Sequence, residues 1–124
     1  MKLNHIHHIA VICSDYEISK RFYTDVLGLN VGNEYYHKER NSYKTDCSLN
    51  GTYVIKLFSF PNLPLFWSRR TALPCFRRDN INKAIKDLDA KGVAYEPICT
   101  DEYTRKRFVF FCDPDGLPIE IYEK

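Results

Sequence analysis

The chain has 124 residues, and its 18 Lys and Arg nearly balance its 16 Asp and Glu, so that the formal net charge is only +2. Because the basic residues are scattered rather than gathered in one stripe, the sequence argues against a surface for nucleic acid. No apolar run approaches the roughly 20 residues of a membrane span, and polar residues interrupt the first positions, so we expect a cytoplasmic protein.

The first half of the chain predicts a strand, a helix and three further strands. The apolar strand of residues 7–13 is followed by Asp15, a helix N-cap residue, and by apolar residues at helical spacing. The helix should end near Gly28, which is suited to the left-handed conformation. Strands are then expected at residues 31–38, 44–49 and 52–60, with the Asn-Gly pair 50–51 as the hairpin turn between the last two.

The second half repeats this order after a segment without a clear pattern. A helix is expected from Asp79 to Gly92, and strands are expected at residues 94–98, 107–112 and 117–123. The Asp-Pro-Asp-Gly segment 113–116 predicts the turn between the last two strands.

A constant offset relates the two halves. Asp15 to Gly28 and Asp79 to Gly92 both span thirteen steps, and at the same offset of 64 residues Lys56 falls on Glu120. The sequence therefore predicts an α+β fold made of two βαβββ modules within one domain of residues 1–124, because the period is long enough for a half-domain. We place module one at about residues 5–61 and module two at about residues 71–124.

The cysteines form an odd set of five without a C-x-x-C spacing: Cys13, Cys47, Cys75, Cys99 and Cys112. This count argues against a disulfide framework and against a zinc knuckle, so we expect reduced, mostly buried thiols.

Three motifs resemble those of the vicinal-oxygen-chelate superfamily, which contains glyoxalases, bleomycin resistance proteins and extradiol dioxygenases. They are His-Ile-Ala-Val at residues 8–11, Phe-Tyr-x-x-Val-Leu-Gly-Leu at 22–29 and Asp-Pro-Asp-Gly-x-x-Ile-Glu at 113–120. Residues 53–61 and 103–108 further resemble a bacterial subgroup of glyoxalase-like proteins. The resemblance implies that each module curls into a half-barrel of curved sheet beside a central cleft, and that the protein is a homodimer.

The resemblance also implies a divalent metal, namely Ni, Zn, Mn or Fe, that binds two vicinal oxygens of a small molecule and acts as a Lewis acid. The ligand positions are the first-strand His and fourth-strand Glu of each module. His8 and Glu120 match the pattern, and Glu120 would also be the catalytic residue. Lys56 stands at the other Glu position, and Leu73, or Ala72 by the strict offset, stands at the other His position, so neither can be expected to bind a metal.

The segment of residues 63–78 departs from the subgroup pattern, because it is shorter and lacks a Gly-Leu-Arg-His-Leu-Ala-Phe strand. One coding of residues 69–76, read one base later, gives Gly-Gly-Leu-Arg-Tyr-Leu-Ala, close to the missing motif. We therefore hypothesise a local frameshift in the gene or its sequencing, which the DNA sequence would test.

The residues themselves leave several readings open. His8 is either a ligand or a hydrogen-bonded residue of an apolar strand, and Lys56 and Glu120 point either into the cleft, where they would contact each other, or toward water. Lys56, Phe58, Tyr36 and Arg107 are candidates for a substrate pocket, although Tyr36 is equally consistent with cross-strand packing and Arg107 with a solvated loop.

Three functions follow from these readings. The first is a glyoxalase-like lyase, isomerase or dioxygenase with an incomplete metal site. The second is a metal-free small-molecule binding protein, similar to the drug-sequestering members of the superfamily. The third is a degenerate paralogue that keeps only the fold.

Overall fold

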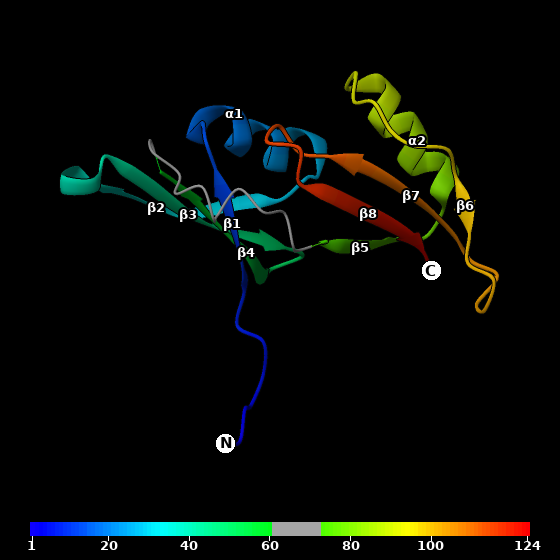
Figure 1. Cartoon of the computed structure of the whole chain (residues 1–124), viewed down its shortest axis with the longest axis horizontal. Helices are drawn as coiled ribbons and strands as arrows, with labels where there is room; N and C mark the ends of the chain where they lie inside the picture. The colour runs from blue at the N-terminus through cyan, green and yellow to red at the C-terminus, as the bar shows by residue number, and fades with distance from the viewer. Residues whose placement is uncertain (61–72) are drawn as a thin grey trace. The chain divides into compact units, whose positions relative to one another are not determined.

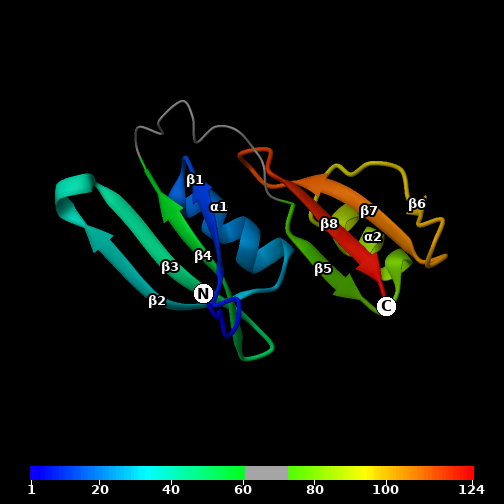
Figure 2. The ribbon, with the colours of Figure 1, turned by 60° about the horizontal axis from the view of Figure 1, so that its bottom comes forward.

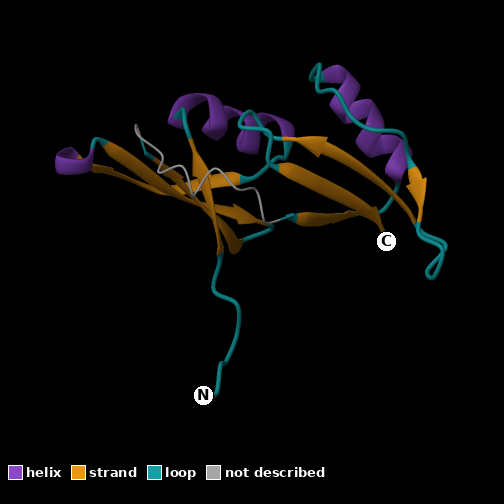
Figure 3. Cartoon of the chain, viewed as in Figure 1, coloured by secondary structure: helices purple, strands orange, loops and turns teal. Residues whose placement is uncertain are grey.

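The structure is a computed structural model, and it describes residues 1–60 and 73–124. The chain divides into two compact units, Met1–Leu65 and Phe66–Lys124, each with one four-stranded sheet and helices on one face (Figures 1 and 3). The predicted α+β class with two βαβββ modules is confirmed. In the part of the chain that is described, no helix is long and apolar enough to cross a membrane.

The first unit contains four strands and one main helix. In chain order its elements are β1 (Ile9–Cys13), α1 (Tyr16–Arg21), the π-helical turn η1 (Phe22–Val26), β2 (Asn30–His37), the 3-10 turn η2 (Lys38–Arg40), β3 (Ser42–Leu49) and β4 (Thr52–Ser59). The sheet order is β1-β4-β3-β2, and only the β1–β4 pair is parallel (Figure 2). The predicted strands and the helix are found, although β1 starts two residues later than expected.

Helix α1 begins where the sequence predicts. The Asp15 carboxylate accepts a hydrogen bond from the Ile18 backbone N–H at 3.0 Å, which satisfies one of the free donors of the first turn. Gly28 has a φ of +72°, so the helical segment ends in the left-handed conformation that favours glycine. The sheet face beneath the helix carries the buried odd-numbered residues of β1 and β4, including Val11, Ile55 and Leu57.

The second unit repeats this topology. Its elements are β5 (Cys75–Arg78), α2 (Ile81–Ala90), β6 (Cys99–Thr100), β7 (Arg107–Cys112) and β8 (Pro118–Glu123), in the sheet order β5-β8-β7-β6, and again the first and fourth strands are parallel. Its core joins Ile81 and Ala84 of the helix to Val109 of the sheet. The Asp113 carboxylate accepts hydrogen bonds from the Asp115 and Leu117 backbone N–H groups, so the predicted turn at 113–116 is confirmed.

Two predictions in this unit need correction. The strand expected at residues 94–98 is wrong, because Pro97 has no N–H to give to the ladder; only Tyr95 forms a bridge there, and β6 starts at Cys99. Helix α2 begins later than Asp79, because the Asn80 side chain is the N-cap acceptor. Strand β5 forms where the subgroup motif is missing; the part of the frameshift segment at residues 63–72 lies outside the described residues.

The expectation of mostly buried cysteines is also wrong. All five thiols are free, but only Cys13 and Cys47 are buried, since these two lie on the face that α1 covers. Cys75, Cys99 and Cys112 are exposed.

Candidate functional site

The face of the first sheet that α1 leaves uncovered, here called the open face, carries the polar residues of interest. On β4 it presents Lys56 and Phe58, which are directly opposite Asp46 and Lys44 of β3. Ala10 of β1 is the neighbour of Lys56 on the other side. His8 lies two residues before Ala10, so strand alternation places it on the same face. His8 and Lys56, two predicted site residues, are thus brought together.

Lys56 forms an ion pair that the sequence analysis did not predict. Its ammonium nitrogen lies 3.4 Å from Asp46 Oδ1, and the two side chains are 20% and 28% exposed. The same nitrogen lies 5.7 Å from the centre of the Tyr53 ring. The Tyr53 oxygen raises the pKa of Lys56, partial burial opposes this, and Asp46 raises the pKa further, so the side chain stays an ammonium.

Two buried oxygens in this cluster depend on the lysine. Asp46 Oδ1 and the Tyr53 hydroxyl are shielded from solvent, and neither has a hydrogen bond of good geometry among the residues that the structure describes. The Lys56 ammonium is the charge near Asp46 Oδ1 that compensates its burial. The cluster is therefore held by charge rather than by well-directed hydrogen bonds.

His8 contacts this cluster through its ring. It stacks on Tyr53 with 5.2 Å between ring centres and 28° between planes, and its Nδ1 lies 2.7 Å from Nδ1 of His7. Partial desolvation, followed by the Lys56 charge, lowers the pKa of His8, so the imidazole is neutral at pH 7. His8 is half-buried and hydrogen-bonded at the start of the strand, and it does not belong to the core.

The strand registers identify equivalent positions in the two units. Lys56 is level with Ala10 on the parallel strand β1, and Glu120 is level with Cys75 on the parallel strand β5. Lys56 and Glu120 are thus equivalent, as the offset predicts. His8 lies two residues before Ala10, and Leu73 lies two residues before Cys75, so the register favours Leu73 as the equivalent of His8. Ala72, the other choice, lies outside the described residues.

Glu120 lies on the face of the second sheet that α2 leaves uncovered. It is half-buried between Cys75 of β5 and Phe110 of β7, and its backbone N–H donates to the Pro74 carbonyl at 2.9 Å. Partial desolvation and the Glu120 carboxylate raise the pKa of the Cys75 thiol to about 11, which leaves it protonated and unreactive at pH 7. The predicted contact between Lys56 and Glu120 joins different units and stays a prediction.

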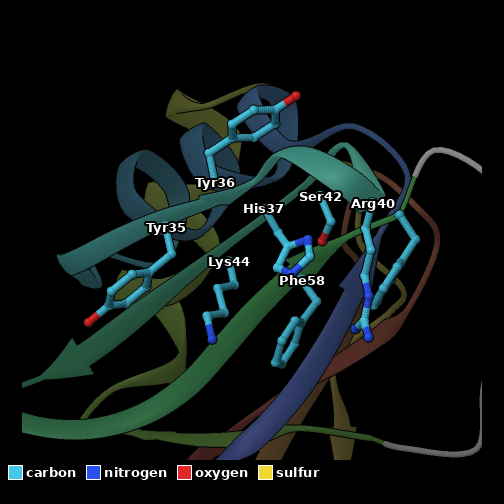
Figure 4. A pocket seen from close by; sticks show the side chains of 8 residues that line it. Tyr35, Tyr36, His37, Arg40, Ser42, Lys44 and Phe58 are labelled. Carbon is cyan, nitrogen blue, oxygen red and sulfur yellow. The ribbon is translucent and has the colours of Figure 1, made fainter.

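A cavity of about 320 Å³ lies on the first unit, lined by Tyr35, Tyr36, His37, Arg40, Ser42, Lys44, Phe58 and Phe60. Figure 4 shows His37, Lys44 and Phe58 extending to one side of the strands and Tyr36 extending to the opposite side. The volume falls in the lower part of the range of small-molecule sites, about 300–1,000 Å³. Phe58 is among the residues that line this cavity, while Lys56 is not.

Tyr36 has other contacts that explain its direction. Its ring lies 4.6 Å from that of Tyr43, which in turn stacks on Tyr16 of α1, and its hydroxyl donates a hydrogen bond to the Asn41 side chain. These contacts correspond to the alternative reading of cross-strand packing.

The cavity combines aromatic surface with positive charge. The Phe58 and Phe60 rings stack 6.2 Å apart, and the Lys44 ammonium lies 5.2 Å from the centre of the Tyr35 ring. Within residues 1–60 and 73–124, neither Lys44 nor Arg40 forms an ion pair. The sequence analysis missed both cations. Alternation along a regular hairpin would have placed Lys44 on the face of Leu57, whereas a register shift in the β3–β4 pair brings it opposite Phe58. Nothing in the sequence marked Arg40.

Arg107 lies on the opposite side of the second sheet from Glu120, on the face that α2 covers. Its guanidinium binds both Glu123 carboxylate oxygens, at 2.8 and 3.0 Å, and its third contact is with the Asn82 side chain. The Arg107 guanidinium lowers the pKa of Glu123 to about 2, and Glu123 also accepts a hydrogen bond from the Ile81 backbone N–H. Arg107 therefore fastens the start of α2 to the sheet, and we leave it out of the pocket.

The residues present do not fit the four-ligand metal site of the resemblance. Lys56 brings a positive charge to one ligand position, and Leu73 brings a hydrocarbon to another. Across residues 1–60 and 73–124, no group of three or more His, Cys, Asp and Glu side chains is arranged to hold a metal ion. His8 and Glu120 are the two positions with donor atoms.

Comparisons with known proteins agree with this fold. Residues 5–121 match the family described as Glyoxalase/Bleomycin resistance protein/Dioxygenase superfamily. The uncharacterized protein YwkD of Bacillus subtilis is 53% identical over the whole length of both chains. The crystal structure of a glyoxalase family protein from Enterococcus faecalis is 32% identical, with a TM-score of 0.84, and covers 99% of this chain and 100% of its own.

Two more distant structures share the fold alone. TnmS3, an antibiotic binding protein from a Streptomyces species, has a TM-score of 0.76 and 22% identity, covering 99% of this chain and 98% of its own. FosX, a fosfomycin resistance protein of Listeria monocytogenes solved with Mn(II) and a dihydroxypropylphosphonic acid, has a TM-score of 0.78 and 17% identity, covering 99% and 94%.

Proposed function

We propose that this chain, which belongs to the glyoxalase/bleomycin resistance protein/dioxygenase superfamily, binds an anionic, aromatic small molecule without a metal ion. The observation that carries the proposal is the cavity on the first unit. Aromatic rings line it together with two cations that form no ion pair with any residue that the structure describes. The antibiotic binding protein TnmS3 shows that this fold is compatible with a binding role.

The chemistry of the lining residues determines the ligand class. Phe58 and Phe60 offer flat apolar surface for an aromatic ring, which is stabilised by stacking and by leaving water. Lys44 and Arg40 then supply positive charge for a carboxylate, sulfonate or phosphonate, and Arg in particular can bind such a group with two parallel hydrogen bonds. A neutral aromatic molecule would use only the first of these interactions.

Direct calorimetry tests the proposal with two probes of equal ring size, 2-naphthoate and the neutral 2-naphthalenemethanol. We expect 2-naphthoate to bind more tightly, and Lys44→Gln and Arg40→Gln each to weaken it by about five-fold, since a partly exposed charged contact contributes about 1 kcal/mol. Lys38→Gln is the matched control, because it removes the same charge from the same unit but does not line the cavity. Equal binding of both probes would contradict the proposal.

A metal-dependent lyase, isomerase or dioxygenase is the second candidate. It is favoured by one observation, namely that both retained ligand residues, His8 and Glu120, lie on the faces that the helices leave uncovered. In that case water or the substrate would complete the coordination of Ni, Zn, Mn or Fe(II), and Glu120 would be the catalytic residue. Metal analysis of the purified protein separates the candidates, because a stoichiometric ion lost on His8→Gln supports the second. The homodimer and the cytoplasmic location stay predictions.

A further inference from the structure

A cluster of side chains on the first unit lies outside the lining of the cavity; it consists of Lys56, Asp46, Tyr53 and His8. Lys56 stands where the superfamily pattern has a metal-binding glutamate, and the structure shows what holds it there. Its ammonium is 3.4 Å from Asp46, its cross-strand partner, and both side chains are mostly buried. Asp46, which is not a ligand position of the pattern, is thus the ion-pair partner of Lys56, which stands at a glutamate position of the pattern.

We propose that Lys56 is a built-in cation that replaces the divalent ion of the superfamily pattern and excludes such ions from the first unit. The proposal extends the proposed metal-free function, but its test uses metal ions rather than aromatic ligands, so the two can fail separately.

The charges of the cluster support this exchange. In the pattern, a carboxylate at position 56 would lie directly opposite Asp46, and two carboxylates this close repel each other unless a cation lies between them. With lysine at position 56, the compensating charge is covalently attached, and the buried Asp46 oxygen is neutralised by it. A divalent ion that approached His8 would meet an ammonium at one ligand position and a carboxylate already paired with that ammonium.

The proposal has a consequence for one substitution. Lys56→Glu would remove the ammonium, introduce a carboxylate and release Asp46, so that two carboxylates and the neighbouring His8 imidazole become available within a single unit. Three N and O donors are the usual minimum of a protein metal site. Mn²⁺ is the appropriate probe, because it prefers oxygen ligands, whereas Ni²⁺ and Zn²⁺ would also bind His5 and His7 next to His8.

Calorimetric titration with Mn²⁺ would compare the parent, Lys56→Gln and Lys56→Glu. We expect the affinity to increase in that order, with Lys56→Glu at least about tenfold tighter than the parent, because even outer-shell changes alter metal affinity by about 10–100-fold. Adding Asp46→Asn to Lys56→Glu should remove most of the gain. The single substitution Asp46→Asn should give no gain in Mn²⁺ affinity.

Two results would overturn the proposal. One is a parent protein that binds one Mn²⁺ as tightly as Lys56→Glu, and the other is a gain in Lys56→Glu that Asp46→Asn does not reduce. Circular dichroism checks that each variant is folded. If Lys56→Glu does not fold, equal Mn²⁺ affinity of the parent and Lys56→Gln decides against the proposal, because removing a repelling charge must then have had no effect.

Discussion

Replacing Lys56 by methionine should destabilise the protein through Asp46. Methionine keeps the apolar stem of the lysine side chain, so the change removes the charge with little loss of packing. Asp46 Oδ1 would then be a shielded carboxylate oxygen without a compensating charge. Breaking a fully buried pair costs about 3–5 kcal/mol, and an exposed pair contributes about 0–1 kcal/mol. With side chains 20% and 28% exposed, we expect a loss of about 1–2 kcal/mol.

Urea unfolding followed by circular dichroism measures this loss. With a slope of about 2 kcal/mol per M, the midpoint of Lys56→Met should fall by about 0.5–1 M. Adding Asp46→Asn should recover about half of the loss, because the uncompensated charge is removed together with its partner. Lys44→Met is the control, since Lys44 lies on the same face without an ion pair in the described parts of the chain, and it should cost less than about 0.5 kcal/mol.

The same series decides between the two partners of Lys56. The sequence predicts Glu120, and the structure shows Asp46. If Glu120→Gln restores the stability of Lys56→Met and Asp46→Asn does not, the reasoning from the Asp46 contact is refuted, and the pairing predicted from the repeat is the correct one.

Two further predictions concern contacts that fasten the helices to the sheets. The Glu123 carboxylate has a pKa of about 2 in the folded state, below its ordinary 4.5, so its contribution to stability is present above pH 4.5 and is lost as the pH falls toward 2. Glu123→Gln should therefore reduce the difference between the urea midpoints measured at pH 7 and at pH 3. An unchanged difference would contradict the Arg107 contact. The Tyr16 hydroxyl donates to the Glu34 carboxylate, so Tyr16→Phe should cost about 1 kcal/mol in urea unfolding at pH 7, whereas Tyr35→Phe, which changes an exposed ring, should cost almost nothing.

Local signals predicted the framework of both units. Asp15 and Asp113 act where the sequence places them, because a carboxylate beside free backbone N–H groups needs only its immediate neighbours. The hairpin at Asn50 and Gly51 is likewise confirmed, since both residues have positive φ angles, as a tight turn requires. Pro97 shows the opposite case, because the strand predicted at residues 94–98 includes a residue that cannot donate to a strand ladder.

The Asp46 contact could not be predicted, because it depends on an irregularity of the hairpin. Leu49 pairs with Thr52 and Ser48 with Tyr53, so a regular ladder would place Asp46 opposite Ile55. A register shift between Cys47 and Ser48 moves the pairing by one residue, and Asp46 then lies opposite Lys56. A shift of one residue moves the side chains of a strand to the other face of the sheet, and no residue type in this hairpin predicts the shift.

The paired registers also locate the duplicated ligand positions that the resemblance implies. In each unit the first and fourth strands are parallel neighbours, so the histidine and glutamate positions of one module lie on adjacent strands. The first unit keeps His8 but has Lys56, and the second keeps Glu120 but has Leu73, so neither unit retains its own adjacent pair. In the second unit a hydrocarbon leaves the position neutral. In the first unit, the Lys56 ammonium, paired with Asp46, puts a positive charge where the pattern has a negative one. A positive charge repels a metal cation, whereas a neutral side chain only fails to bind it. Under the proposal for Lys56 the two substitutions are therefore not equivalent, because Lys56 places a positive charge at its ligand position and Leu73 does not.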